Sequence, residues 1–171
     1  MAAFYEEAES LSPEEINLPQ LTYVSLNGNM LTRVPPVLKF FPKLLQLHLH
    51  INRITDVREL CRNAFNKLEV LDLGNNKIRE LPVALVHHMP NLSLINLINN
   101  DLANVPPLLG LHKGLKTVQL DGNPLKTLRR PVIEKGTDAI MRFLRDKYVE
   151  ERDSVIEDWA MEMEQADNQY A

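Results

Sequence analysis

One pattern of residues recurs along this chain, and its first copy reads Leu21-Thr22-Tyr23-Val24-Ser25-Leu26-Asn27-Gly28-Asn29-Met30-Leu31. Four later copies keep the apolar residues and the Asn at the same offsets, and their Asn residues are Asn52, Asn76, Asn100 and Asn123. The five Asn residues are spaced 23, 24, 24 and 23 positions apart. A period of this length indicates a stack of similar units, each of which buries its apolar face only against its neighbours.

Each repeat is predicted to supply one short strand and one return segment. In the first copy Val24 and Leu26 alternate with polar or aromatic residues, so this apolar pair faces inward. The intervening Tyr23, Ser25 and Asn27 then lie on the concave face of a parallel sheet. We expect the side chains of the recurring Asn to form a ladder that bonds buried turn backbone. The predicted fold class is α/β, a right-handed solenoid of five repeats with a parallel concave sheet and helical caps.

Both ends of such a stack need a cap, because the outer apolar faces would otherwise meet water. We predict an N-terminal half-repeat cap over 1–20, five repeats over 21–136, and a C-terminal cap helix with an acidic amphipathic tail over 137–171. Ser12 and Glu15 have capping-box spacing. Thr137 is predicted to be the N-cap of the closing helix. The apolar face of that helix is formed by Ile140, Met141, Leu144 and Tyr148.

Two columns of the return segments contain an unusual residue. Cys61 stands where the other repeats have Leu, so we interpret it as a packing residue and not as a reactive thiol. A second apolar column runs through Phe65 and Met89 and is broken by His112. We expect the neighbouring Leu111 to fill that gap.

Composition excludes several classes of protein. Of the 171 residues 28 are Leu and 44% are apolar, which is enough for one core, and a single Cys excludes a disulfide framework. No stretch approaches the roughly 20 apolar residues of a membrane span. The first residues lack a basic start followed by an apolar run, so we expect no export signal. These features favour a cytoplasmic location and leave the nucleus open.

Charge is arranged in blocks. Residues 1–20 contain five Glu and no base, residues 21–146 contain 17 bases and 10 acids, and residues 147–171 contain two bases and eight acids, which gives the net charge of -4. Bases follow the recurring Asn along one edge, here called the basic edge: Arg33, Arg53, Lys77, Arg79, Lys126, Arg129 and Arg130. Binding of an acidic ligand or RNA through this edge is the alternative function. The chain has few aromatic residues and a pI near 5.7, and both features count against nucleic acid as the ligand of this edge.

Motifs of common enzymes are absent. The chain has no phosphate-binding loop, no H-E-x-x-H, no C-x-x-C and no G-x-S-x-G, so we expect no catalytic residue, no cofactor and no metal. The best constellation for chemistry is His48 and His50 on one strand with Asp72 on the next. Because neighbouring strands lie about 4.8 Å apart, His48 and Asp72 should be within reach. A metal enzyme at these three residues is the third hypothesis.

Two surfaces are predicted to bind a protein partner. The concave face combines an apolar centre with a polar rim, which is the composition of a protein-binding patch. Its predicted contact residues are Tyr23, Ser25, Gln46, His48, His50, Val70, Asp72, Leu94, Asn96, Ile98, Gln119 and Asp121. The second surface is a stripe in the tail formed by Val155, Trp159 and Met163. That stripe belongs either to a cap helix that folds back onto the solenoid or to a helix that binds a partner.

The repeat L-x-x-L-x-L-x-x-N-x-L, followed by V/L-P, resembles the intracellular leucine-rich repeats of Ras-suppressor-type proteins. The closing stretch, from Asp121-Gly122-Asn123-Pro124 to Lys135-Gly136-Thr137, more narrowly resembles the C-terminal repeats of the leucine-rich repeat-containing protein 40 subfamily. The resemblance covers 21–146, and Arg58 departs from it because neighbouring repeats have Pro there. It implies a non-catalytic adaptor or scaffold that binds a protein partner and has no small-molecule substrate.

Overall fold

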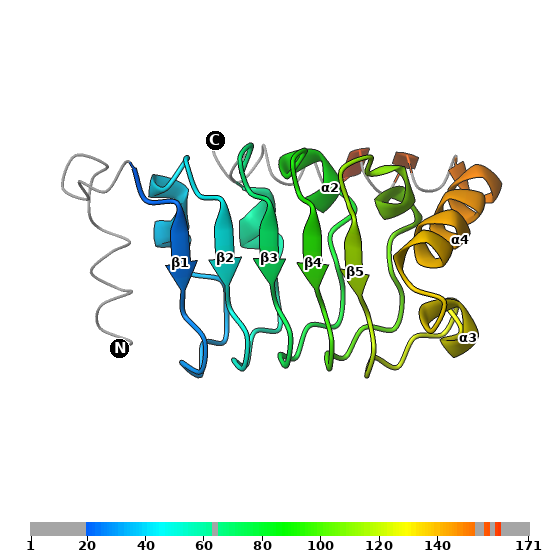
Figure 1. Ribbon diagram of the computed structural model, residues 1–171, viewed down its shortest axis with the longest axis horizontal. Helices are drawn as coiled ribbons and strands as arrows, with labels where there is room; N and C mark the ends of the chain where they lie inside the picture. The colour runs from blue at the N-terminus through cyan, green and yellow to red at the C-terminus, as the bar shows by residue number, and fades with distance from the viewer. Residues whose placement is uncertain (1–19, 63–64, 153–155, 158–159, 162–171) are drawn as a thin grey trace.

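The computed structural model describes residues 20–62, 65–152, 156–157 and 160–161. Its centre is a five-stranded parallel sheet whose strands follow one another in chain order (Figure 1). The strands are β1 (Tyr23–Ser25), β2 (Gln46–His48), β3 (Val70–Asp72), β4 (Leu94–Asn96) and β5 (Thr117–Gln119). This order confirms the predicted solenoid, because each turn of the chain adds one strand beside the previous one.

Short helical segments form the return half of each repeat and lie behind the sheet in Figure 1. They are the 3-10 helices η1 (Pro36–Phe40), η2 (Arg58–Cys61) and η3 (Pro107–Leu111) and the α-helix α2 (Leu85–His88). Pro36 and Pro107 stand at the first position of η1 and η3, where a fixed φ and a missing N–H cost nothing.

The second repeat begins its return helix without Pro. Oδ1 of Asp56 instead accepts a hydrogen bond of 2.8 Å from the backbone N–H of Arg58. Oδ2 of Asp56 also lies 2.6 Å from Nη2 of Arg58, and the side-chain hydrogen bond from Arg58 lowers the pKa of Asp56. An Asp–Arg pair thus takes the place that Pro has in the other repeats.

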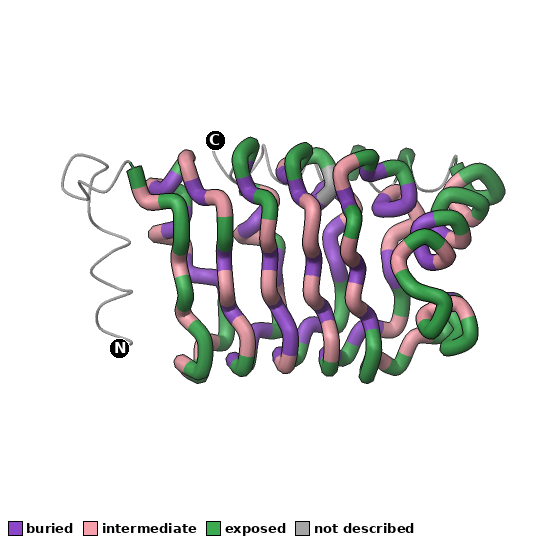
Figure 2. The backbone as a smooth tube through the Cα atoms, in the orientation of Figure 1, coloured by how far each residue is buried: buried purple, intermediate pink, exposed green. Residues whose placement is uncertain are grey.

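The core lies between the sheet and the return segments (Figure 2). Leu47, Leu71 and Ile95 from the middle of successive strands are 0% exposed. In the first repeat the corresponding Val24 is only half-buried. Cys61 is also half-buried and packs against this core, as its column predicts.

The Asn ladder is present as predicted. Nδ2 of Asn76 donates to the carbonyl oxygens of Leu49, Leu73 and Gly74, and its Oδ1 accepts from the N–H of Ile54. The same pattern recurs at Asn52, Asn100 and Asn123. Each side chain therefore joins two adjacent repeats, and the bonds of Asn76 are buried.

Two short helices close the C-terminal end, α3 (Arg130–Ile133) and α4 (Thr137–Glu150). Helix α4 packs on η3, and Ile140, Met141 and Leu144 are buried there as predicted. Tyr148 is half-buried.

The prediction that Thr137 caps α4 was wrong. Gly136 holds the N-cap position with φ 84°, in the left-handed region that favours Gly. Oγ1 of Thr137 instead accepts a hydrogen bond of 3.0 Å from the N–H of Val118, so this hydroxyl fastens the cap to β5.

The prediction for Leu111 was also wrong. Leu111 is 40% exposed, whereas His112 is 7% exposed and fills the column itself. Nε2 of His112 lies 2.9 Å from the carbonyl oxygen of Met89, and Nδ1 accepts from the N–H groups of Gly114 and Leu115. An imidazole with both nitrogens hydrogen-bonded can replace an apolar side chain here.

Several predicted features lie outside the described residues. They are the capping box of Ser12 and Glu15, most of the predicted N-terminal cap, and the tail residues Val155, Trp159 and Met163. Within the described part of the chain no helix is both long and apolar enough to cross a membrane.

Candidate functional site

The outward side chains of the strands form regular columns across the concave face. Strand register pairs Gln46 with Val70 and Val70 with Leu94, and it pairs His48 with Asp72 and Asp72 with Asn96. Tyr23 and Ser25 extend these columns at β1, and Thr117 and Gln119 extend them at β5. The predicted concave-face residues of the five strands are thus brought together on one surface, while their role in binding stays a prediction.

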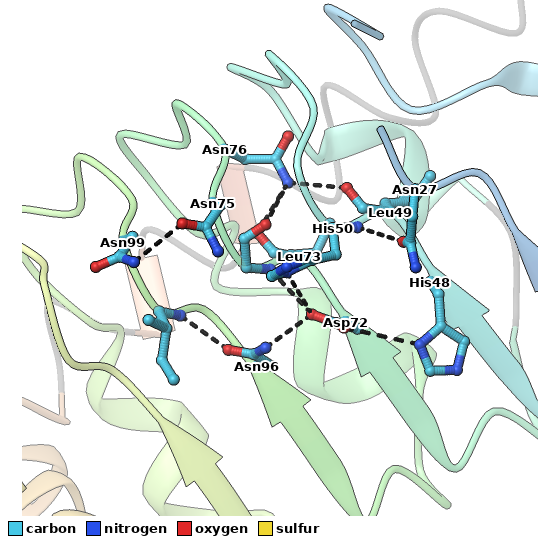
Figure 3. A network of polar contacts seen from close by, with 12 residues as sticks. Asn27, His48, Leu49, His50, Asp72, Leu73, Asn75, Asn76, Asn96 and Asn99 are labelled. Atoms are coloured by element: carbon cyan, nitrogen blue, oxygen red, sulfur yellow. Dashed lines mark hydrogen bonds and ion pairs between the residues drawn. The ribbon is translucent and has the colours of Figure 1, made fainter. Parts of the chain in front are cut away.

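Asp72 is the hub of a polar network at the centre of this face (Figure 3). Its Oδ1 accepts hydrogen bonds from Nδ2 of Asn96 at 2.8 Å and from the N–H of Gly74 at 3.1 Å. Oδ1 of Asn96 in turn accepts from the N–H of Ile98 at 3.0 Å. These bonds hold the two side chains in fixed positions before any ligand arrives.

Two imidazoles flank the same carboxylate. Nδ1 of His48 lies 3.7 Å from Oδ2 of Asp72, and Nδ1 of His50 lies 3.8 Å from Oδ1. Both separations exceed hydrogen-bond distance, and Nδ1 of His50 is buried without a hydrogen-bond partner among the described residues. The centre of the face therefore contains a carboxylate between two groups that can become cationic.

Gly74 leaves room for this arrangement, and it is not among the residues predicted from the sequence to form the site. A Cβ at Gly74 would stand 2.9 Å from both Nδ2 of Asn96 and Nδ1 of His50. The available signal was a glycine in a column where the neighbouring strands have His50 and Ile98. Asn27 was expected on the concave face but not among the contact residues, and its Oδ1 accepts a 2.8 Å hydrogen bond from the N–H of His50.

An apolar centre adjoins the polar network. Val70, Leu94 and Ile98 are half-buried, so part of each side chain is accessible from the concave side. At the β1 end Tyr23 is 54% exposed, and its ring centroid lies 5.2 Å from that of His48. A large exposed aromatic residue at the rim of such a face is typical of a binding anchor.

The described residues offer no group of three His, Cys, Asp or Glu side chains that could hold a metal ion. The hypothesis of a metal enzyme at His48, His50 and Asp72 therefore gains no support from their geometry.

The basic edge is less continuous than the sequence pattern indicated. Arg53, Lys77 and Arg79 are exposed, but exposed acids interrupt them. Glu80 follows Arg79 directly, and Asp101 takes in the next repeat the place that Lys77 has. A surface of alternating charge attracts a polyanion less strongly than a strip of positive charge does.

A shallow groove of about 640 Å³ lies at the opposite edge, where the chain enters strands β2 to β5. Its polar lining includes Lys67, Glu69, Asn91 and Lys116. The repeat pattern gives no signal for this groove, because these residues lie before the strands in positions without a shared residue type.

Comparison with known proteins agrees with this geometry. The family model "Leucine rich repeat" matches residues 42–102, which include β2, β3 and β4. The chain has a leucine-rich-repeat fold. The predicted repeat type is therefore confirmed, while the narrower resemblances to Ras-suppressor-type proteins and to the protein 40 subfamily stay predictions.

Three curated relatives are much longer than this chain. Human "Leucine-rich repeats and immunoglobulin-like domains protein 1" is 32% identical over 127 residues, which are 72% of this chain and 12% of that protein. Chaoptin of Drosophila melanogaster is 30% identical over 63% of this chain and 10% of its own length. Decorin of Equus caballus is 34% identical over 49% of this chain and 24% of its own length. The chain thus spans less than a third of each of these three relatives.

Three solved structures superpose on the solenoid. A leucine-rich-repeat protein of Leptospira interrogans has a TM-score of 0.61 and 32% identity and covers 73% of this chain, which corresponds to 31% of that protein. The plant peptide hormone receptor RGFR1, solved in complex with RGF2, has a TM-score of 0.53 and 27% identity. The PEPR1–AtPEP1 structure has a TM-score of 0.53 and 30% identity. These two cover 66% of this chain, which corresponds to 18% and 16% of theirs.

Proposed function

We propose that this chain is a non-catalytic protein-interaction module that binds a protein partner on the concave face of its sheet. The observation that supports this most directly is the apolar centre of Val70, Leu94 and Ile98 beside the fixed polar network of Asp72 and Asn96. An accessible apolar centre with a polar surround is the anatomy of a protein interface.

The fixed network matters because it reduces the entropy lost on binding. The carboxylate of Asp72 is already held by Asn96 and Gly74 in the free protein. A partner that bonds to this surface does not have to order those side chains, so more of the contact energy remains as affinity.

The solved relatives support the same class of ligand. RGFR1 and PEPR1 were each solved with a second named component, and the former is described as a peptide hormone receptor. From these two structures we take only the class of ligand, which is a protein or peptide. The adaptor or scaffold role, a cytoplasmic location and kinship with the protein 40 subfamily belong to the proposal as well.

The test is affinity capture with the partner identified and then titrated as a purified protein. We expect Leu94→Asp to weaken partner binding by about tenfold or more, because it places a charge in the apolar centre. Leu111→Asp is the matched control, since Leu111 is an exposed leucine on η3, away from the concave face.

A chain ending at Arg152 separates the concave face from the tail. If the truncated chain loses the partner and Leu94→Asp retains it, the binding surface is the tail and the proposal is wrong. A partner whose affinity falls steeply with salt and that proves to be nucleic acid favours the basic edge instead.

A further inference from the structure

The residue before each ladder Asn adopts a left-handed backbone conformation. Four of the five repeats place there a residue type that tolerates it: Gly28, Asn75, Asn99 and Gly122, with φ between 53° and 72°. The second repeat has Ile51 at φ 54°. A β-branched residue in this region is a genuine outlier, because its Cβ crowds the backbone.

Packing does not explain Ile51. Ile51 is 57% exposed and is not one of the residues of the buried core. Asn at this position would not disturb the ladder. Asn76 and Asn100 make their ladder hydrogen bonds although Asn75 and Asn99 precede them. Strain that persists without a packing reason points to a role of the side chain at the surface.

Met30 repeats this combination of strain and exposure on the adjoining turn. It has φ 57° and is 66% exposed. The N–H groups on either side of it, those of Asn29 and Leu31, both donate to Oδ1 of Asn52, the residue after Ile51. Two strained and exposed apolar side chains therefore lie on neighbouring turns at one edge of the solenoid.

The sequence around this pair is basic. From Gln20 to Thr55 it contains four Lys or Arg and no Asp or Glu, and the next residue, Asp56, is paired with Arg58. Arg53 is exposed, and its backbone N–H donates to the carbonyl oxygen of Leu31. Arg53 therefore lies next to the turns that contain Met30 and Ile51. We call Met30, Ile51 and Arg53 the Ile51 edge.

We infer that the Ile51 edge is a docking site for an acidic segment of a protein partner, in which an apolar side chain contacts Met30 and Ile51 and a carboxylate contacts Arg53. Charge complementarity selects the acidic segment, and the two aliphatic side chains favour a peptide over a polyphosphate, which offers them no apolar contact. This inference rests on the proposed protein-binding function but places the contact at the edge of the first two repeats and not at the concave centre.

The test selects a displayed library of random short peptides against the full-length chain and titrates the enriched peptides with variants. We expect peptides that combine Asp or Glu with apolar residues. Ile51→Asn should weaken their binding about tenfold or more and raise Tm by a few degrees, because Asn tolerates the left-handed conformation. Arg53→Glu should weaken the same peptides and leave Tm nearly unchanged.

Matched variants separate the possible outcomes. Ile51→Val keeps the apolar branched side chain and should retain binding. Leu111→Asn and Lys126→Glu should also retain binding, because they make comparable changes to an exposed aliphatic and an exposed basic residue elsewhere. Enriched peptides without acids, equal affinity for Ile51→Asn, or tighter binding of single-stranded RNA that Arg53→Glu abolishes would each overturn the inference. If the peptides depend on Leu94 and not on Ile51, the inference fails while the concave-face proposal stands.

Discussion

Single Asn side chains connect the repeats of this solenoid, and their value depends on burial. Asn76 is 2% exposed and makes four hydrogen bonds to backbone groups of its own and the preceding repeat. Asn29, at the start of the ladder, is half-buried and donates to the carbonyl oxygen of Asn27 at the surface. Asn residues in the same column therefore differ in how many buried hydrogen bonds their side chains make.

We expect Asn76→Ala to lower the free energy of unfolding by about 2–4 kcal/mol, because it leaves several buried backbone groups without partners. The matched Asn29→Ala should cost about 1 kcal/mol or less, since water can replace its bond. Urea unfolding followed by circular dichroism measures both. Equal losses would contradict the expectation that the contribution of each Asn depends on its burial.

A second prediction at this scale concerns His88 on α2. Burial lowers the pKa of His88, and the charge of His87 lowers it further, so the folded protein disfavours the protonated form. Stability from this group is present above the ordinary His pKa of about 6.5 and is lost as the pH falls below it. We expect His88→Gln to make Tm fall less between neutral and mildly acidic pH. Identical slopes for both proteins would contradict this.

The elements meet most closely at the C-terminal cap. A Cβ at Gly110 would stand 2.5 Å from the backbone nitrogen of Arg145 and 2.8 Å from the carbonyl carbon of Leu144. These are backbone atoms of α4, and a helix backbone cannot yield as a flexible side chain can. Helix α4 can therefore cover η3 at this distance only because residue 110 has no side chain.

We expect Gly110→Ala to push α4 away from η3 and to cost about 2–4 kcal/mol, comparable to other overpacking changes in a core. Leu111→Ala, next to it and 40% exposed, is the control and should cost less than about 1 kcal/mol. Thermal unfolding measures both, and hydrogen exchange of α4 amides reports whether the cap has loosened. An unchanged Tm for Gly110→Ala would show that α4 does not sit this close in solution.

At the scale of the whole molecule, stability is a sum over neighbouring repeats. Leu73 in the third repeat is 0% exposed with a repeat on each side, whereas Leu26 occupies the same column in the first repeat and is half-buried. The stack should therefore be most stable in the middle.

We expect Leu73→Ala to cost about 3–5 kcal/mol and Leu26→Ala about 1–2 kcal/mol, because the first leaves a larger cavity between two repeats. Chemical denaturation of the two variants compares identical chemistry at two places in one column. Equal costs would mean that the first repeat is as well covered as the third.

The repeat by itself determined the architecture. Leu47 and Leu71 are buried and Asn52 and Asn76 form the ladder because period, alternation and polar satisfaction are properties of a short stretch that recurs. The columns of the concave face followed equally, since side-chain direction alternates along any strand.

Only the tertiary structure decided how particular side chains meet. Whether Leu111 or His112 fills the column depends on the carbonyl of Met89, which belongs to the previous repeat. The room above Gly74 depends on His50 and Asn96, which come from the strands on either side. Such contacts join residues more than twenty positions apart, so no local pattern specifies them. The strain at Ile51 likewise became visible only as a backbone angle.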